Sequence, residues 1–244
     1  MKILVIPDVH LKPYIFDEAR NITEVREVDN IVCLGDIVDD WGQENNITLY
    51  EKTLDAMISF AKDYPDALWC WGNHDISYIW QALESGYSGF AENTVRLKLG
   101  LFERTLREHG QLAFIHRVDE VLFVHGGLSE EFVRGIQQKY QIPESEVNDI
   151  DALVRRINML RKEDMWKDDS PLWLRPQYGR CRLFKSDEYL QVVGHTPVYD
   201  ICLEDGFIST DVFSTRSDGK SIGRPGFLII DTVTRETTVL RKKT

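Results

Sequence analysis

Apolar residues are concentrated in five short runs along the chain, and each run ends abruptly in polar or small residues. The runs are nearly continuous in Ile, Leu, Val and Phe, which is typical of strands that are covered on both faces. They occupy residues 2–10, 30–36, 67–75, 121–127 and 190–197. A further apolar stretch at 226–242 predicts a hairpin whose turn lies near Thr234 and Arg235.

Helical periodicity appears between these predicted strands. One apolar stripe comprises Ile47, Tyr50, Leu54, Met57, Ile58 and Ala61, and it ends at Pro65. A second stripe comprises Val147, Ile150, Val154, Ile157 and Leu160. Strands that alternate with helices indicate an α/β fold. The second stripe lies in a long segment, about 129–187, which we expect to be a helical cap inserted into a single domain spanning residues 1–244.

Residues able to bind metal ions occur at the end of each of the five strands. The strand ends read Asp8-x-His10, Gly35-Asp36, Gly72-Asn73-His74-Asp75, His125-Gly126-Gly127 and Gly194-His195-Thr196-Pro197. Among the 6 histidines, only His109 and His116 lie elsewhere. In open α/β sheets the carboxyl ends of the strands surround a crevice. We therefore expect the five strand ends to converge on one site.

Each motif taken alone has a simpler explanation. Asp and Gly-Asp are common in turns, Asp75 would suit the start of a helix, and a single histidine is usually part of the core. Their recurrence after five strands favours a shared metal centre. Carboxylate, imidazole and amide ligands without a thiolate suit Mn, Fe or Zn better than Ca. Asp36 would bridge two ions, one on each oxygen, as in the two-metal sites of phosphatases and nucleases.

Composition narrows the range of partners. The chain has 40 acidic and 29 basic residues and a formal net charge of -11, which disfavours sequence-independent binding of nucleic acid. The 4 cysteines form no C-x-x-C pair, which suits a reducing compartment. The first strand begins almost at the N-terminus, and no apolar run is long enough to span a membrane. We expect a cytoplasmic protein without a membrane partner.

The motifs D-x-H, G-D-x-x-D, G-N-H-D, H-G-G and G-H-T-P, in this order, resemble those of the calcineurin-like metallophosphoesterase superfamily. The resemblance implies a four-layer sandwich, in which two packed mixed β-sheets are flanked by helices, with a dinuclear centre at one edge. By position, it implies that Asp8, His10 and Asp36 hold one metal, and that Asp36, Asn73, His125 and His195 hold the other. His74 would act as general acid, or as electrostatic stabiliser of the leaving oxygen, with Asp39 orienting its ring.

The motifs are most similar to the phosphoprotein-phosphatase branch, which includes serine/threonine phosphatases and symmetrical dinucleoside tetraphosphatases. Pro197 stands where diesterase-like members have a second histidine, and this favours monoesters. Asp40 replaces the phosphate-binding arginine of the branch. Arg175, Arg180 and Arg216 are candidate substitutes, because a guanidinium pairs well with phosphoryl oxygens. Alternatively, the first two lie on a solvated loop and the third in a flexible turn.

The resemblance implies a metal-dependent phosphoric ester hydrolase with two divalent ions, for which Mn is expected and Fe or Zn are alternatives. We expect a phosphomonoesterase that acts on a phosphoprotein or a small phosphoester through a hydroxide bridging the metals. An alternative is hydrolysis of dinucleoside polyphosphates or other small nucleotides. The third possibility is a non-catalytic scaffold. Such a protein could lose its metal-binding residues, whereas here every expected metal ligand and His74 are present.

Overall fold

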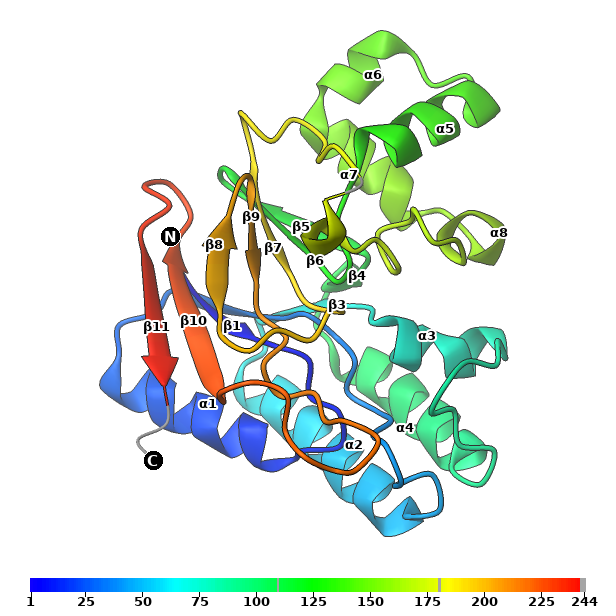
Figure 1. Ribbon diagram of the computed structural model, residues 1–244, viewed down its shortest axis with the longest axis vertical. Coiled ribbons are helices and arrows are strands. Elements are labelled where there is room, and N and C mark those ends of the chain that lie inside the picture. The colour runs from blue at the N-terminus through cyan, green and yellow to red at the C-terminus, as the bar shows by residue number, and fades with distance from the viewer. Residues whose placement is uncertain (109, 180, 242–244) are drawn as a thin grey trace.

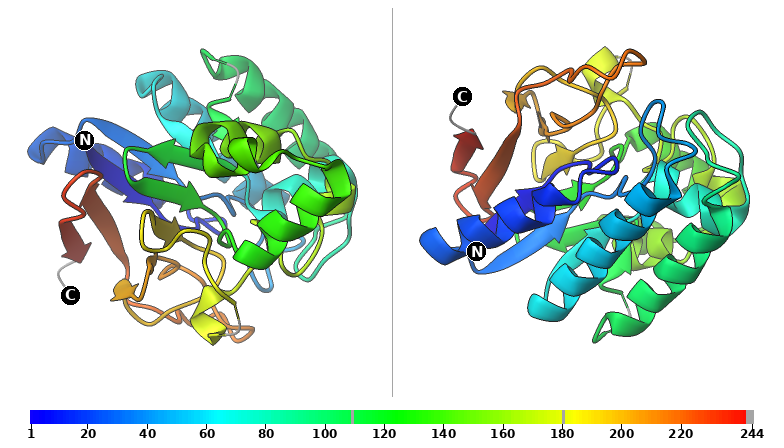
Figure 2. Two further views of the ribbon diagram at one scale, coloured as in Figure 1. Left: turned by 90° about the horizontal axis from the view of Figure 1, so that it is seen from above. Right: turned by 90° about the horizontal axis from the view of Figure 1, so that it is seen from below.

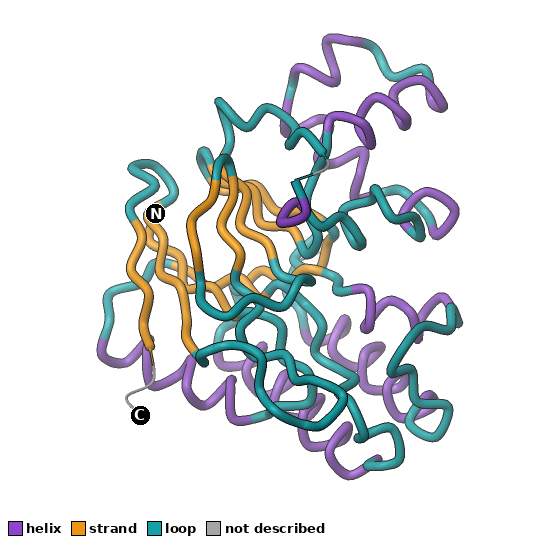
Figure 3. Tube along the Cα trace, in the orientation of Figure 1, coloured by secondary structure: helices purple, strands orange, loops and turns teal. Residues whose placement is uncertain are grey.

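The computed structural model describes residues 1–108, 110–179 and 181–241. Its strands form two sheets, and the helices lie outside them (Figures 1 and 3). Helices, first sheet, second sheet and further helices therefore succeed one another as layers. This is the predicted α/β fold of two mixed sheets flanked by helices.

The first sheet has six strands in the order β11-β10-β1-β2-β3-β4. They are β1 (Lys2–Ile6), β2 (Asn30–Cys33), β3 (Leu68–Cys70), β4 (Leu112–Ala113), β10 (Gly226–Asp231) and β11 (Thr237–Arg241). The strands from β1 to β4 are parallel, whereas β10 pairs antiparallel with β1 and β11. The predicted hairpin is confirmed, and its turn includes Arg235 in a left-handed conformation, φ 60°.

The second sheet has five strands in the order β5-β6-β7-β9-β8. They are β5 (Ile115–Val118), β6 (Val121–Val124), β7 (Leu190–Val193), β8 (Cys202–Glu204) and β9 (Phe207–Ser209). The three central strands are parallel to one another, and the two edge strands are antiparallel. All four residues of β6 and of β7 are buried, as expected for strands with both faces covered.

Helices cover the outer face of the first sheet. They include α1 (Tyr14–Val25), α2 (Ile47–Asp63) and α4 (Glu92–Thr105), which Figure 2 shows side by side from below, while α3 (Asn73–Trp80) continues directly from the end of β3. The predicted stripe of α2 faces the core except at its first residue, Ile47, which is exposed. Asn46 caps the helix by accepting a hydrogen bond from the backbone nitrogen of Leu49, and the helix ends before Pro65.

The segment between β6 and β7 is helical, as predicted. It contains α5 (Glu130–Tyr140), α6 (Glu144–Asn148), α7 (Ile150–Asn158), α8 (Lys162–Met165) and a 3-10 turn at Pro176–Tyr178. The stripe from Val147 to Leu160 is divided between helices, which corrects the prediction of one continuous stripe. Asp149 ends α6, and its side chain then caps α7 by accepting hydrogen bonds from the backbone nitrogens of Asp151 and Ala152. None of the helices in the described ranges is long and apolar enough to cross a membrane.

Candidate metal centre

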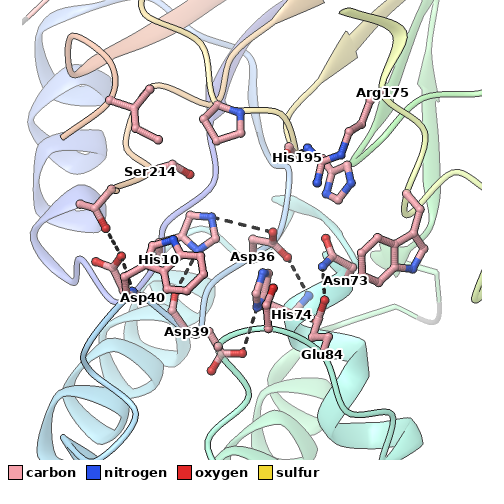
Figure 4. Close-up of a pocket in the computed structure, with 17 residues that line it drawn as sticks. His10, Asp36, Asp39, Asp40, Asn73, His74, Glu84, Arg175, His195 and Ser214 are labelled. Atoms are coloured by element: carbon pink, nitrogen blue, oxygen red, sulfur yellow. Dashed lines mark hydrogen bonds and ion pairs between the residues drawn. The ribbon is translucent and has the colours of Figure 1, made fainter. Parts of the chain in front are cut away.

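A cavity of about 210 Å³ opens where the carboxyl ends of β1, β2, β3 and β7 meet (Figure 4). Its lining includes His10 after β1, Asp36 after β2, Asn73 and His74 at the start of α3, and His195 after β7. Asp8 and His125 belong to the same cluster but are fully buried beneath the cavity. The carboxyl ends of parallel strands bring these residues together, from β1, β2 and β3 in the first sheet and from β6 and β7 in the second.

Asp8, His10 and Asp36 form the first group that could hold a cation, with one ligand atom from each lying within 4.8 Å of the others. His10 and Asp36 both adopt left-handed backbone conformations, φ 43° and 47°, so that the chain turns sharply after each strand. Nδ1 of His10 lies 2.8 Å from the backbone oxygen of Asp39 and must donate to it. Nε2 is thereby left facing Asp36, 3.9 Å from Oδ2.

Asp36, His125 and His195 form the second group, again with their ligand atoms within 4.8 Å of one another. His125 directs Nδ1 to the backbone oxygen of Leu34 at 2.9 Å, which places the proton of the neutral ring on that atom. Its Nε2 then has a lone pair 2.9 Å from Oδ1 of Asn73 and 3.3 Å from Oδ2 of Asp36. Three electron-pair donors therefore face one another, and a cation would satisfy all three. Asp36 belongs to both groups.

Two buried atoms in this cluster, Oδ1 of Asp8 and Nε2 of His195, have no hydrogen-bond partner among the described residues. An unpaired buried polar atom costs about 1–3 kcal/mol, so such atoms usually have a specific function. Glycine at position 194 keeps the space beside Asp8 free, because a Cβ there would lie 2.0 Å from Oδ1 of Asp8. A Cβ at Gly72 would likewise lie 2.1 Å from Oδ1 of Asp36. The donor types and the unpaired atoms fit two divalent cations.

The pKa values of several side chains in the cluster are shifted far from their usual range. Burial alone would raise the pKa of the Asp36 carboxyl, but the nearby rings of His125 and His74 outweigh it and hold this pKa well below the usual range. Burial would lower the pKa of His125, but Asp36 reverses this and raises it to about 9, so that a proton occupies the ring at neutral pH when no cation does. Burial and the neighbouring His125 depress the pKa of His195, which leaves its lone pair available.

His74 is placed differently from the other histidines of the site. Its Nδ1 lies 3.0 Å from Oδ2 of Asp39, and its backbone nitrogen donates to Oδ1 of Asp36 at 2.9 Å. Burial would lower the pKa of this ring, but the carboxylates of Asp36 and Asp39 raise it to about 10. Oδ1 of Asp39 accepts hydrogen bonds from the hydroxyls of Tyr50, at 2.7 Å, and Tyr78, at 2.6 Å. In the metal-free protein the His74 ring is thus an oriented group that carries a proton beside the two candidate ligand groups.

Glu84 is a site residue that the sequence analysis missed. It follows α3 in a loop and lines the cavity, with a side chain that is 6% exposed. Its Oε2 accepts a hydrogen bond of 2.6 Å from Nδ2 of Asn73, and its Oε1 lies 3.7 Å from Nδ1 of His74 (Figure 4). Burial raises the pKa of Glu84 to about 7. No motif marks this position, and nothing in the sequence separates it from an exposed loop glutamate.

Two of the three candidate arginines belong to the described residues, and these two differ in position. Arg175 lines the cavity, and its Nη1 donates to the backbone oxygen of His195 at 2.9 Å and to Oγ1 of Thr196 at 3.2 Å. Arg216 is exposed in a turn closed by its backbone hydrogen bonds with Lys220 and Gly219. Arg180 lies outside the described residues. Only the first of the two described arginines therefore reaches the cavity lining.

Asp40, at the position of the branch's arginine, also lines the cavity. Its Oδ2 lies 2.8 Å from Nζ of Lys12, and the hydroxyl of Thr215 donates to its Oδ1. The lysine ammonium therefore compensates the carboxylate from one side, and the cavity wall here carries little net charge rather than the positive charge of an arginine.

The sequence matches a family model, described as calcineurin-like phosphoesterase, over residues 1–227. No curated protein matches it. Among solved structures, the chain is similar to a cold-active protein-tyrosine phosphatase of the psychrophile Shewanella sp., at 18% identity and a TM-score of 0.56, over 98% of this chain and 80% of that one. It is also similar to a protein serine/threonine phosphatase from Saccharomyces cerevisiae, at 12% identity and a TM-score of 0.56, over 100% of this chain and 81% of that one. At these identities the likeness concerns the fold.

Proposed function

The chain belongs to the calcineurin-like phosphoesterase family, and from this premise we propose that it is a metal-dependent hydrolase of phosphomonoesters. The observation that carries the proposal is the membership of Asp36 in both candidate ligand groups. A carboxylate offers two oxygens, so one side chain can serve two cations at once. A family relative that had lost its activity would have no reason to keep this arrangement.

We propose two metal positions that share Asp36. Asp8 and His10 complete the first, and Asn73, His125 and His195 complete the second. Imidazole, carboxylate and amide ligands favour Mn, Fe or Zn, and Mn is the ion that we would test first. When bound, two such cations would supply positive charge for the phosphoryl oxygens and acidify the attacking water.

The chain's own residues would then handle the leaving group. Without cations, nearby carboxylates raise the pKa of His74 to about 10, so the ring of the metal-free protein carries a proton at neutral pH. With Nδ1 facing Asp39, Nε2 is the ring atom that would donate a proton to the departing oxygen. Asp39 would hold the ring in this orientation while its other oxygen accepts from two tyrosine hydroxyls. Proton donation of this kind contributes roughly 10²–10⁴ in rate.

We propose Arg175 as the residue that binds the phosphoryl group in place of the branch's arginine. Its guanidinium has further N–H groups beyond the two bonds to His195 and Thr196, and it lines the same cavity. The segment between β6 and β7 supplies it, together with the neighbouring Trp173. In this proposal the helical insertion therefore forms one wall of the substrate site.

A monoester is favoured over a diester because Pro197 stands where a second histidine would complete the diesterase motif. The two solved structures described above are named as protein phosphatases, which agrees with a phosphoprotein substrate. The second candidate is a dinucleoside polyphosphate or another small nucleotide. Trp41, 48% exposed, and Trp173 both line the cavity and offer aromatic surfaces on which a base could stack.

A substrate panel with Mn-loaded protein separates these functions. Phosphotyrosine and phosphoserine peptides, diadenosine tetraphosphate and an aryl phosphodiester would be compared by kcat/KM, with chelated protein as control. The proposal predicts metal-dependent turnover that is fastest on a monoester. Preference for the dinucleotide would select the second candidate, and no metal-dependent hydrolysis of any substrate, including an aryl phosphate, would indicate a non-catalytic scaffold.

We further propose that the protein works in the cytoplasm. Cys33, Cys70, Cys181 and Cys202 are all free, and the first two are buried. Free cysteines suit a reducing compartment.

A further inference from the structure

We propose that Glu84 is a positioning residue, which fixes the side-chain amide of Asn73 so that Oδ1 faces the second metal position. This inference rests on the proposed function, because it assigns a role to the residue behind one of the proposed ligands. It adds a residue from a loop that contains none of the sequence motifs.

The two side chains are joined by a hydrogen bond of 2.6 Å from Nδ2 of Asn73 to Oε2 of Glu84. An ionised carboxylate can only accept, so with Glu84 ionised the group of Asn73 that faces it is the NH₂. The opposite end of the amide, Oδ1, then points to Nε2 of His125, 2.9 Å away, on the side of Asp36. A flipped amide would place its NH₂ among the ligands instead. An amide nitrogen is no metal ligand, so the flip would remove Asn73 from the site.

Glu84 is held where this contact requires it. The helix before it ends at Gln81 in a left-handed conformation, φ 48°, and the chain then turns back across the cavity. The loop is closed by Ser88, whose backbone nitrogen donates to the hydroxyl of Tyr78 at 2.8 Å and whose Oγ accepts from the backbone nitrogen of Ala91 at 3.0 Å. Tyr78 also donates to Asp39, so the loop is tied to the network that orients His74.

Charge reinforces the arrangement. Oε1 of Glu84 is buried with no hydrogen-bond partner in the part of the chain that the structure describes, and it lies 3.7 Å from Nδ1 of His74, while Oε2 accepts from Asn73. A carboxylate that accepts from a ligand polarises it and makes its oxygen a better donor of electron density. Residues that act in this way behind metal ligands typically contribute 10–100-fold to metal affinity or activity.

Binding of Mn²⁺ to metal-free protein, followed by isothermal titration calorimetry, tests the role directly. Glu84→Ala should weaken one of the two Mn²⁺ equivalents by about 10–100-fold and leave the other unchanged. Glu84→Gln should bind more tightly than Glu84→Ala, because a glutamine carbonyl can still accept from Nδ2 of Asn73. Glu92→Gln is the matched control. It neutralises a glutamate at the start of α4, outside the cavity lining, and should bind both equivalents as the wild type does.

A double-mutant cycle separates positioning from other effects. In an Asn73→Ala background, Glu84→Ala should cause no further loss of Mn²⁺ affinity, because its partner is already absent. A full additional loss there, or equal weakening of both equivalents, would overturn the inference. Glu84→Ala binding both equivalents normally would overturn it as well. Wild-type protein that binds no Mn²⁺ would instead contradict the proposed function itself.

Discussion

Oδ2 of Asp39 lies 3.0 Å from Nδ1 of His74, and this contact holds the ring at the edge of the candidate metal cluster. Asp39 reaches it from a left-handed backbone conformation, φ 64°, while its other oxygen accepts from two buried tyrosine hydroxyls. The two tyrosine hydroxyls therefore hold the carboxylate of Asp39, and this carboxylate in turn orients the ring of His74. This arrangement would suit a proton donor, because a ring held in one orientation can face the leaving oxygen without first having to rotate.

Replacing His74 tests proton donation. His74→Asn removes the acidic ring but preserves the backbone N–H that donates to Asp36. We expect turnover to fall by roughly 10²–10⁴, because that is the usual contribution of one general acid. Two Mn²⁺ equivalents should remain by elemental analysis, since His74 is not a proposed ligand. Unchanged turnover would exclude the ring from the mechanism.

Removing one tyrosine tests the support behind Asp39. Tyr50→Phe deletes a buried donor 2.7 Å from Oδ1 of Asp39. Urea denaturation should show a loss of about 1–2 kcal/mol in the free energy of unfolding, and kcat should fall while KM stays constant. Tyr64→Phe is the control. Its hydroxyl bonds to Thr23 at 2.7 Å away from the cavity, so it should lower stability without lowering kcat. Equal kcat in both variants would contradict the orienting role of Asp39.

If Asp36 bridges two cations as proposed, its replacement should weaken metal binding at both proposed positions. Asp36→Asn keeps the size of the side chain but replaces one oxygen with an NH₂ that cannot bind a cation. Metal content should therefore fall well below two equivalents per chain when measured by elemental analysis. Asp66→Asn, an exposed carboxylate, should leave it unchanged. Full occupancy in Asp36→Asn would show that the two ligand groups do not share this side chain.

The parts of the fold that were predictable are those that a short stretch of consecutive residues encodes. Near-continuous apolar runs identified β1, β2, β3, β6 and β7, and the motifs that follow these strands contribute to the candidate ligand groups or to the cavity lining. The strands β4, β5, β8 and β9 were not predicted, because no near-continuous apolar run marks them: β5 contains His116 and Arg117, and β8 contains Glu204. The division of the second helical stripe was missed because a polar residue at Asp149 fits either a helix surface or a cap.

The candidate site, too, was predictable only where short sequence motifs mark its residues. Its proposed ligands occur in recognisable motifs because each lies one to four positions beyond a strand. Glu84 was not predictable, since its contact with Asn73 depends on the path of the loop after α3 rather than on spacing. The arginines also required the structure, because only the fold distinguishes Arg175 in the cavity wall from Arg216 in an exposed turn. Their roles stay predictions.

The glycine before His195 predicts a steric effect on the first metal position. In Gly194→Ala, the new methyl group would lie 2.0 Å from Oδ1 of Asp8, so this carboxylate must move. We expect a loss of about 1–3 kcal/mol in the free energy of unfolding and weaker binding of one Mn²⁺ equivalent. Gly100→Ala is the matched control, because a Cβ there meets nothing within 4 Å and the residue lies inside α4. This control should raise stability, by about 0.5–1 kcal/mol. Unaltered Mn²⁺ binding in Gly194→Ala would contradict the placement of Asp8.

His116 predicts a pH dependence of stability that is independent of the metal centre. The ring is buried in β5, and Nε2 donates to the backbone oxygen of Trp69 at 2.9 Å. Burial lowers its pKa in the folded state, whereas in the unfolded chain the value returns to about 6.5. Below that pH the unfolded state binds more protons than the folded state, so stability decreases as the pH falls from 6.5 towards the lower pKa of the folded protein.

His116→Gln keeps a donor for Trp69 but cannot titrate. Urea denaturation of metal-free protein at two pH values, one above and one below about 6.5, should therefore show a smaller loss of stability in the variant than in the wild type. Equal losses would show that this ring does not titrate between the two states.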